Sequence, residues 1–143
     1  MSELQTLAGT DEGVRKSRIL IIDDDPSFAK MVREWIKDIY KVDVITDGSK
    51  ATVFLGKMPA DNRVDLILLD YEMPVCDGPE VFGLIRREPS YADIPIVFLT
   101  GNGSEEAIAK VMKLKPDGYI IKSGSRESLL EYISTKLNEK RSN

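Results

Sequence analysis

The hydrophobic pattern of the chain begins with a short continuous apolar run, Ile19–Ile22, which is followed by an amphipathic stretch. From Phe28 to Ile39 the apolar residues recur at the spacing i, i+3, i+4, i+7, i+8 and i+11, which predicts a helix with one apolar face. A continuous apolar run is typical of a strand that is buried on both faces of a parallel sheet. Asp25 is expected to cap the helix, with Pro26 at its first position.

The same alternation recurs along the rest of the chain. Four further strands are predicted at Lys41–Ile45, Leu66–Leu69, Ile96–Leu99 and Tyr119–Ile121. Helical spacing follows each of them, within Ser49–Lys57, Val81–Ile85, Ala107–Met112 and Leu129–Leu137. Five strands that alternate with five helices predict an α/β fold, a doubly wound five-stranded parallel sheet with helices on both faces. The charge of Asp43 interrupts the second strand, which suits the edge of the sheet.

The composition narrows the class of protein. A length of 143 residues predicts one domain, and 42% apolar with 31% charged residues is ordinary for a globular chain. One cysteine excludes an intrachain disulfide, and the sequence contains neither a membrane-spanning run nor a signal peptide, so a cytoplasmic location is expected. The net charge of −4 argues against direct binding to nucleic acid or to an anionic membrane.

The absence of histidine limits the chemistry most strongly. Without histidine the chain can form no Ser-His-Asp or Cys-His triad, no histidine-ligated zinc site and no phosphohistidine. Any chemistry must therefore use carboxylates, hydroxyls, lysine or a hard metal ion.

Polar residues follow the predicted strands at the points where the strands end. Asp23 and Asp24 follow the first strand, Asp70 follows the third, Thr100 the fourth and Lys122 the fifth. In open α/β sheets, ligands bind outside the carboxyl ends of the strands, where the strand order reverses. With the strand order 2-1-3-4-5, the first and third strands are neighbours at this point, and three carboxylates converge there.

Such a cluster of carboxylates needs a cation, because like charges in one pocket repel one another. Oxygen ligands suit Mg²⁺, which is typically held by one or two carboxylates together with phosphate oxygens. Lys122 adds a second positive charge and Thr100 adds a hydroxyl group. A carboxylate nucleophile, a metal ion, a lysine and a hydroxyl together favour phosphoryl transfer onto an aspartate.

Several segments resemble the sequence signatures of response-regulator receiver domains, namely ILIIDDDP, LILLDYEMPVCDG, PIVFLTG and GYIIK. The resemblance runs from about Arg18 to Leu137 and keeps the order and approximate spacing of the family. It implies a flavodoxin-like receiver fold over residues 17–138. Residues 1–16 are polar and lack periodicity, which predicts a flexible N-terminal tail, and residues 139–143 are predicted to form a polar C-terminal tail.

The resemblance also implies roles for the residues at the strand ends. Asp70 matches the phosphoacceptor, and Asp23 and Asp24 match the acidic pair that organises Mg²⁺. Glu72 matches the position whose backbone carbonyl usually completes the protein ligands of the metal. Lys122 matches the lysine that contacts the phosphoryl oxygens.

Two further positions match the switch of the family, and one position departs from the family pattern. Thr100 matches the hydroxyl that moves toward the phosphoryl group, and Tyr119 matches the aromatic side chain whose rotamer often follows. The family usually has proline after the lysine, often in a cis peptide bond, but here Ser123 follows Lys122. A cis bond without proline costs about 3–4 kcal/mol, so a trans bond and a rearranged loop are predicted.

The main hypothesis is a receiver of a two-component or phosphorelay system, which takes a phosphoryl group from a partner phosphohistidine onto Asp70 with Mg²⁺. The donor would be a histidine kinase or a histidine phosphotransfer protein. The phosphoryl group would switch a surface that binds an output protein. No turnover of a separate substrate is expected. Receivers often dimerise through the face of the fourth and fifth helices, so a homodimer through that face is an alternative to a monomer.

Two other functions remain open. A degenerate receiver would bind partners without phosphorylation; Ser123 favours this alternative, whereas the intact Asp70, Thr100 and Lys122 argue against it. A small aspartyl-phosphate phosphatase is the second alternative, because the segment DYE resembles the Asp-x-Asp start of such enzymes. However, a glutamate replaces the second aspartate of that motif, and the chain lacks room for a substrate-closing cap.

Overall fold

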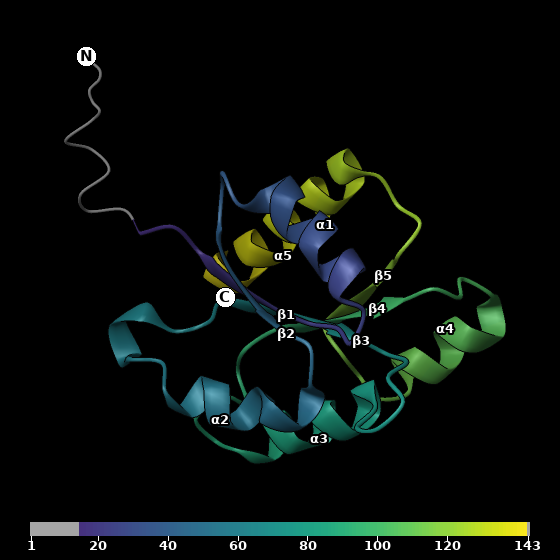
Figure 1. The fold of residues 1–143 in the computed structure, drawn as a ribbon, viewed down its shortest axis with the longest axis horizontal. Coiled ribbons are helices and arrows are strands. Elements are labelled where there is room, and N and C mark those ends of the chain that lie inside the picture. The colour runs from purple at the N-terminus through teal and green to yellow at the C-terminus, as the bar shows by residue number, and fades with distance from the viewer. Residues whose placement is uncertain (1–14, 143) are drawn as a thin grey trace.

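Five parallel strands form the central sheet of the protein in a computed structural model that describes residues 15–142 (Figure 1). The strands are β1 (Arg18–Ile22), β2 (Lys41–Ile45), β3 (Leu66–Asp70), β4 (Ile96–Thr100) and β5 (Gly118–Ile121). Their order is β2-β1-β3-β4-β5, which confirms the predicted doubly wound α/β fold. Ile22 of β1 lies opposite both Ile45 of β2 and Leu69 of β3, so these three strands end at one edge of the sheet.

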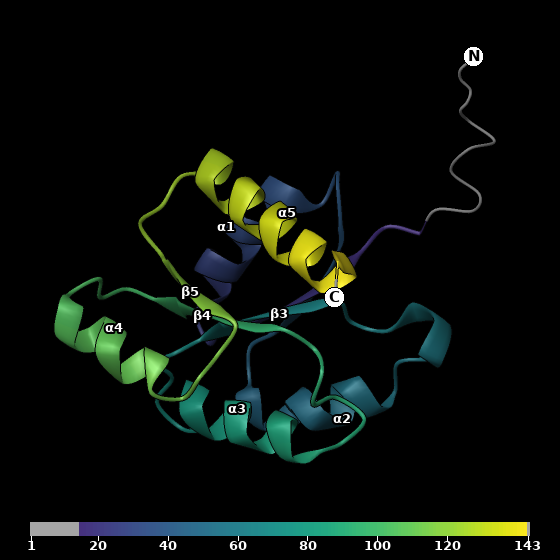
Figure 2. The same cartoon turned by 180° about the vertical axis from the view of Figure 1, so that it is seen from behind.

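Helices cover both faces of the sheet. They are α1 (Pro26–Ile36), α2 (Ala51–Gly56), α3 (Gly78–Arg87), α4 (Glu105–Met112) and α5 (Arg126–Ser142), with the short 3-10 turns η2 (Gly48–Lys50) and η3 (Ala60–Asn62). Helices α1 and α5 lie on one face, and α2 and α3 lie on the other (Figures 1 and 2). Helix α4 lies beside β4 and β5 on the side of α3.

Side-chain caps determine where several helices begin. Asp25 caps α1, because its carboxylate accepts the backbone N–H groups of Ser27 and Phe28 at 3.0 and 3.3 Å. This confirms the predicted cap. Asp77 and Glu80 form a capping box at the start of α3, in which each carboxylate accepts the backbone N–H of the other residue. A cap of this kind typically contributes about 1 kcal/mol.

Three helix boundaries differ from the predicted ones. Helix α1 ends at Ile36, although the apolar spacing continues to Ile39, because a turn places the N–H groups of both Ile39 and Tyr40 on the Ile36 carbonyl. The helix predicted over Ser49–Lys57 is divided into η2 and the shorter α2. Helix α5 continues through the polar residues 139–142, which were predicted to form a tail.

The predicted N-terminal tail falls mostly outside the described residues. Its last two members, Arg15 and Lys16, are described. Arg15 pairs with Asp65 at 3.0 Å, and Lys16 donates to the backbone carbonyl of Asp38. These contacts hold both residues against the amino-terminal edge of the sheet.

The hydrophobic core has two layers, one on each face of the sheet. Ile19 and Ile21 of β1 pack toward α1 and α5, whereas Leu20 and Ile22 pack toward α2 and α3. This alternation explains the continuous apolar runs, because every apolar side chain of the inner strands β1, β3 and β4 is buried. Each large one contributes about 1.5–3 kcal/mol. Strand β2 lies at the edge and is only half-buried, as the charge of Asp43 predicted.

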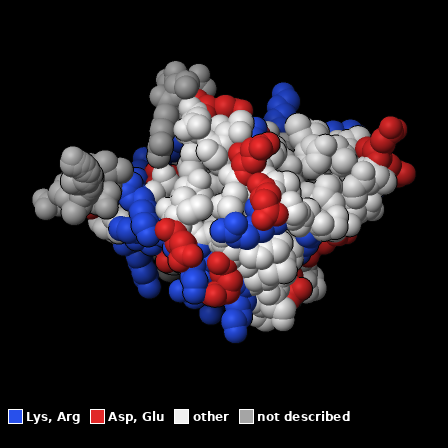
Figure 3. Space-filling model, turned by 90° about the horizontal axis from the view of Figure 1, so that it is seen from above, with Lys and Arg blue, Asp and Glu red and all other residues white. Residues whose placement is uncertain are grey.

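The surface carries charges of both signs. Figure 3 shows Lys and Arg side chains intermingled with Asp and Glu over the face in view, without a continuous basic stripe on that face. Among the described helices, none is both long and apolar enough to cross a lipid bilayer.

Candidate functional site

The carboxyl ends of the strands bring the predicted acidic residues together. Asp23 and Asp24 directly follow β1, and Asp70 is the last residue of β3. Because β1 and β3 are neighbours and end together, a carboxylate oxygen from each of these three residues lies within 4.8 Å of the others. The prediction that three carboxylates converge here is therefore confirmed.

Two of the three carboxylates are deeply buried. Asp23 is 0% exposed and Asp70 is 3% exposed, whereas Asp24 faces solvent. One oxygen of Asp23 accepts the backbone N–H of Asp25 at 2.9 Å, and Asp70 accepts that of Glu72 at 3.3 Å. These bonds orient the carboxylates but leave most of their charge to be balanced by cations.

Lys122 supplies the nearest positive charge. Its Nζ lies 2.9 Å from Oδ2 of Asp23 and 3.3 Å from Oδ1 of Asp70, and its side chain is 22% exposed. Burial alone would lower the pKa of Lys122, but hydrogen bonding and the charges of Asp23 and Asp70 outweigh it and raise the pKa overall. Lys122 is therefore a fixed cation at neutral pH.

Asp70 has a strongly perturbed acidity. Burial raises its pKa first and the negative charge of Asp23 raises it further, so that the pKa reaches about 7 even though Lys122 acts in the opposite direction. A carboxylate must be ionised to attack phosphorus. A cation that binds beside Asp70 would favour the ionised form, so cation binding and nucleophilicity are linked.

The acidic cluster fits a magnesium ion. All three side chains offer oxygen ligands, and when they are ionised one ammonium group opposite three carboxylates leaves two negative charges uncompensated. Oδ2 of Asp23 is buried and accepts no well-aligned hydrogen bond; its 2.9 Å contact with Lys122 is an ion pair. An oxygen-rich site with two excess charges suits a divalent hard cation.

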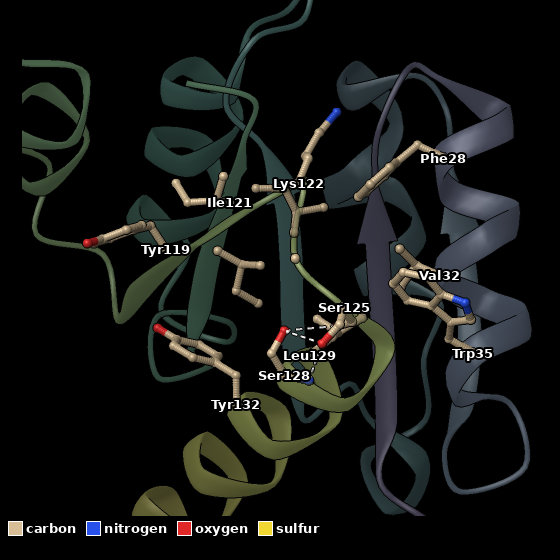
Figure 4. A pocket seen from close by; sticks show the side chains of 13 residues that line it. Phe28, Val32, Trp35, Tyr119, Ile121, Lys122, Ser125, Ser128, Leu129 and Tyr132 are labelled. Carbon is tan, nitrogen blue, oxygen red and sulfur yellow. Dashed lines mark hydrogen bonds between the residues drawn. The ribbon is translucent and has the colours of Figure 1, made fainter. Parts of the chain in front are cut away.

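The other predicted residues surround this cluster. Thr100 is 2% exposed, and its hydroxyl exchanges hydrogen bonds with the backbone of Asn102 at 3.2 and 3.4 Å. Glu72 lies at the exposed mouth, on the wall of a polar pocket of about 300 Å³ that Thr100 and Lys110 also line. Tyr119 packs against the core layer of α2 and α3, and Figure 4 shows its side chain directed away from Lys122.

The loop after β5 has the predicted trans geometry. No cis peptide bond occurs among the described residues, so the bond between Lys122 and Ser123 is trans. The backbone N–H of Lys122 continues the sheet by donating to Thr100, and Gly124 closes a turn onto Ile121. The lysine is thus fixed by the sheet on one side and followed by a short exposed turn on the other.

Two features next to Lys122 were not predicted from the sequence. An apolar cavity of about 260 Å³ lies between α1, β5 and α5, and Trp35, Leu129 and Tyr132 are among its walls (Figure 4). At its rim, the ring of Phe28 lies 4.6 Å from Lys122 Nζ, measured to the ring centroid. The position of Phe28 in the first turn after the acidic pair was the only signal in the sequence that could have indicated this contact.

Comparisons with known proteins agree with this arrangement. A family model described as the response regulator receiver domain matches residues 19–134. The response regulator Rcp1 of Synechocystis is 29% identical over 87% of this chain and 88% of its own length. The structure of the chemotaxis response regulator CheY4 of Vibrio cholerae is similar with a TM-score of 0.76 at 28% identity, covering 85% of this chain and 99% of that one.

Other relatives are much longer than the matched region. A probable cyclic di-GMP phosphodiesterase of Vibrio cholerae is 31% identical over 92% of this chain, but the match covers 29% of that protein. The chain therefore spans less than a third of this relative's length.

Proposed function

Because the chain belongs to the response regulator receiver domain family of two-component signalling, we propose that it accepts a phosphoryl group on Asp70. The observation that carries the proposal is the grouping of Asp70 with two other carboxylates and Lys122 at the carboxyl edge of the sheet. In this proposal the donor is a phosphohistidine of a histidine kinase or a histidine phosphotransfer protein, since the 143 residues of the sequence contain no histidine.

The transfer is an in-line displacement at phosphorus. A carboxylate oxygen of Asp70 forms the new P–O bond while the P–N bond to the donor imidazole breaks, and the electron pair stays on the imidazole nitrogen. Lys122 Nζ, held 3.3 Å from Oδ1 of Asp70, is placed to neutralise charge on the transferred oxygens. Little covalent chemistry is required of the protein, so positioning and charge neutralisation supply the catalysis.

Magnesium would be held by Asp23, Asp24, Asp70 and the backbone carbonyl of Glu72. When bound, the ion would supply positive charge that neutralises the carboxylates and the phosphoryl oxygens. Asp23 and Asp24 orient the ligand set from the end of β1, and the buried position of Asp23 keeps its carboxylate aimed at the site.

The switch would start at Thr100. Its hydroxyl is bonded to the backbone of Asn102 and would exchange this partner for a phosphoryl oxygen, which gains a charge-assisted hydrogen bond. Movement of the β4–α4 loop would then reach Tyr119 and the surface of α4, β5 and α5, where an output protein or a second copy of the chain would bind. The chain acts in the cytoplasm and turns over no separate substrate in this proposal.

The test is phosphate-affinity gel mobility of the purified chain after incubation with acetyl phosphate, with and without Mg²⁺. We expect a Mg²⁺-dependent shifted band that Asp70→Asn lacks. Asp47→Asn is the matched control, because Asp47 caps η2 at the surface and asparagine caps equally well. Failure of the unmodified chain to shift with acetyl phosphate, phosphoramidate and a matched kinase would refute the proposal. It would favour a degenerate receiver that binds partners without phosphorylation.

A further inference from the structure

Lys122 has an aromatic neighbour that no step of the proposed reaction uses. Phe28 lies in the first turn of α1 and is half-buried, with its ring centroid 4.6 Å from the lysine ammonium. The ammonium therefore lies between two carboxylates, Asp23 and Asp70, and the face of a benzene ring. Figure 4 shows the Phe28 ring directed toward the Lys122 side chain at the rim of the apolar cavity.

The Lys122 side chain lies between an exposed turn and the apolar cavity. Ser123, Gly124 and Ser125 follow it as an exposed turn. On its inner side the lysine borders the apolar cavity of about 260 Å³. A free lysine side chain has up to about 2 kcal/mol of rotamer entropy to lose, so fixing its ammonium requires specific contacts.

The backbone of Phe28 is tied to the same acidic loop that pairs with Lys122. Asp23 accepts the N–H of Asp25 at 2.9 Å, and Asp25 accepts the N–H of Phe28 at 3.3 Å. The ring of Phe28 then contacts Lys122, whose ammonium returns to Asp23 at 2.9 Å. These four contacts close a loop, so the ring is held at a fixed place relative to the carboxylates.

We propose that Phe28 is a positioning residue that holds the Lys122 ammonium at the phosphoryl site through a cation–π contact. The inference rests on the proposed function, because the position matters only if Lys122 meets a phosphoryl group. An aromatic face suits this task, since it attracts the cation but cannot bind the incoming phosphoryl oxygens in competition with it. The ring thus contributes to electrostatic preorganisation without touching the reacting atoms.

The test compares initial rates of Asp70 phosphorylation by acetyl phosphate with saturating Mg²⁺. In this reaction a carboxylate oxygen of Asp70 bonds to phosphorus, the P–O bond to acetate breaks, and acetate leaves with the electron pair. Phe28→Leu keeps an apolar side chain but removes the ring, and should slow the rate roughly two- to fivefold. Phe28→Tyr keeps the ring and should restore the rate of the unmodified chain.

Two controls separate positioning from folding. Trp35→Leu makes the same kind of change on the same helix and the same cavity, away from Lys122, and should leave the rate unchanged. In a Lys122→Met background, Phe28→Leu should have no further effect, because the residue through which it acts is gone. Equal losses in both backgrounds, or a rate for Phe28→Leu equal to that of the unmodified chain, would overturn the inference.

A second measurement does not depend on phosphorylation. Methylene protons of Lys122 above the ring should show an upfield ring-current shift in NMR spectra, present with Phe28→Tyr and lost with Phe28→Leu. If the unmodified chain lacks this shift, the contact does not exist and the inference fails. If the unmodified chain is never phosphorylated, the proposed function fails and the inference with it. Phosphorylation that is insensitive to Phe28 refutes the inference alone.

Discussion

The two ends of the sheet both gather charged side chains, but they balance the charges differently. At the amino ends of the strands, Asp65 accepts the backbone N–H of Arg18 at 2.8 Å and pairs with Arg15 at 3.0 Å. Asp43 pairs with the guanidinium of Arg18 at 2.6 Å. Each carboxylate in this group has a guanidinium of its own, so no net charge is left for a ligand to neutralise.

A third aspartate at the amino end is also paired with a guanidinium. Asp117, just before β5, accepts the backbone N–H of Ile96 at 2.8 Å and pairs with Arg86 at 2.8 Å. It holds the starts of β4 and β5 together. Asp65 and Asp117 therefore satisfy a backbone donor and a cation at once, which is a structural task.

The carboxyl end lacks this balance. Three carboxylates lie close together, and one ammonium group, that of Lys122, pairs with two of them, Asp23 and Asp70. The pKa of Asp70 rises to about 7 as a result of burial and the charge of Asp23. The excess negative charge weakens the fold and at the same time creates affinity for a cation. The comparison shows that surplus charge, rather than the presence of charge, distinguishes the binding edge from the structural edge.

The largest expected effect comes from removing the shared cation. Lys122→Met should lower the free energy of unfolding by about 2–3 kcal/mol at pH 7 without Mg²⁺, because it leaves two buried carboxylates uncompensated. Mg²⁺ should restore part of this loss by supplying positive charge, and urea unfolding with and without the ion measures both effects. The same destabilisation at all Mg²⁺ concentrations would show that the ion and the lysine do not share a charge cluster.

A smaller effect of opposite sign is expected for Asp70. Asp70→Asn removes a buried carboxylate whose ionisation is disfavoured, and should raise the free energy of unfolding by about 1–2 kcal/mol at pH 7 without Mg²⁺. The matched change at the other end, Asp65→Asn, should lower it, because Asp65 is paired with Arg15. Urea unfolding of the two variants side by side tests the comparison directly, and changes of the same sign would contradict it.

The free energy of unfolding of the unmodified chain should depend on pH because of the surplus negative charge at the carboxyl end of the sheet. The pKa of Asp70 in the folded protein is about 7, above its ordinary value of 3.8. Between pH 3.8 and 7, Asp70 therefore keeps its proton in the folded protein and has lost it in the unfolded chain. Stability from this group is therefore fully present below about pH 4 and is lost as pH rises through 7. Mg²⁺ affinity should rise over the same interval, because the ion and the proton compete. Thermal unfolding from pH 4 to 8 should show this decline, and Asp70→Asn should lack it.

The sequence predicted the arrangement of the site well because strand ends obey simple geometry. Asp23, Asp70 and Thr100 each follow an apolar run, and parallel strands bring such positions to one edge. The trans bond at Lys122 was predictable from the local cost of a cis bond without proline.

Other features depend on local turns and on contacts between distant residues, which hydrophobic and polar spacing cannot predict. Apolar spacing continues through the turn at Ile39, so the end of α1 was placed one turn too late. The hydroxyl of Thr100 is oriented by the backbone of Asn102, and the contact of Phe28 depends on the path of a lysine side chain from another element. Helical spacing placed Phe28 on the core face of its helix. It could not indicate which residues of other elements contact its ring.

The smallest expected effect concerns Asp25, which is adjacent to the acidic pair but has a structural task. Its carboxylate accepts two backbone N–H groups at the start of α1, a bonding pattern that asparagine can reproduce. Asp25→Asn should therefore change the free energy of unfolding by less than about 0.5 kcal/mol. It should also leave Mg²⁺ affinity nearly unchanged in a calorimetric titration, whereas Asp24→Asn should weaken it severalfold. An equal loss of affinity in both variants would mean that general negative charge near the edge attracts the ion, and that the converging carboxylates do not form a defined ligand set.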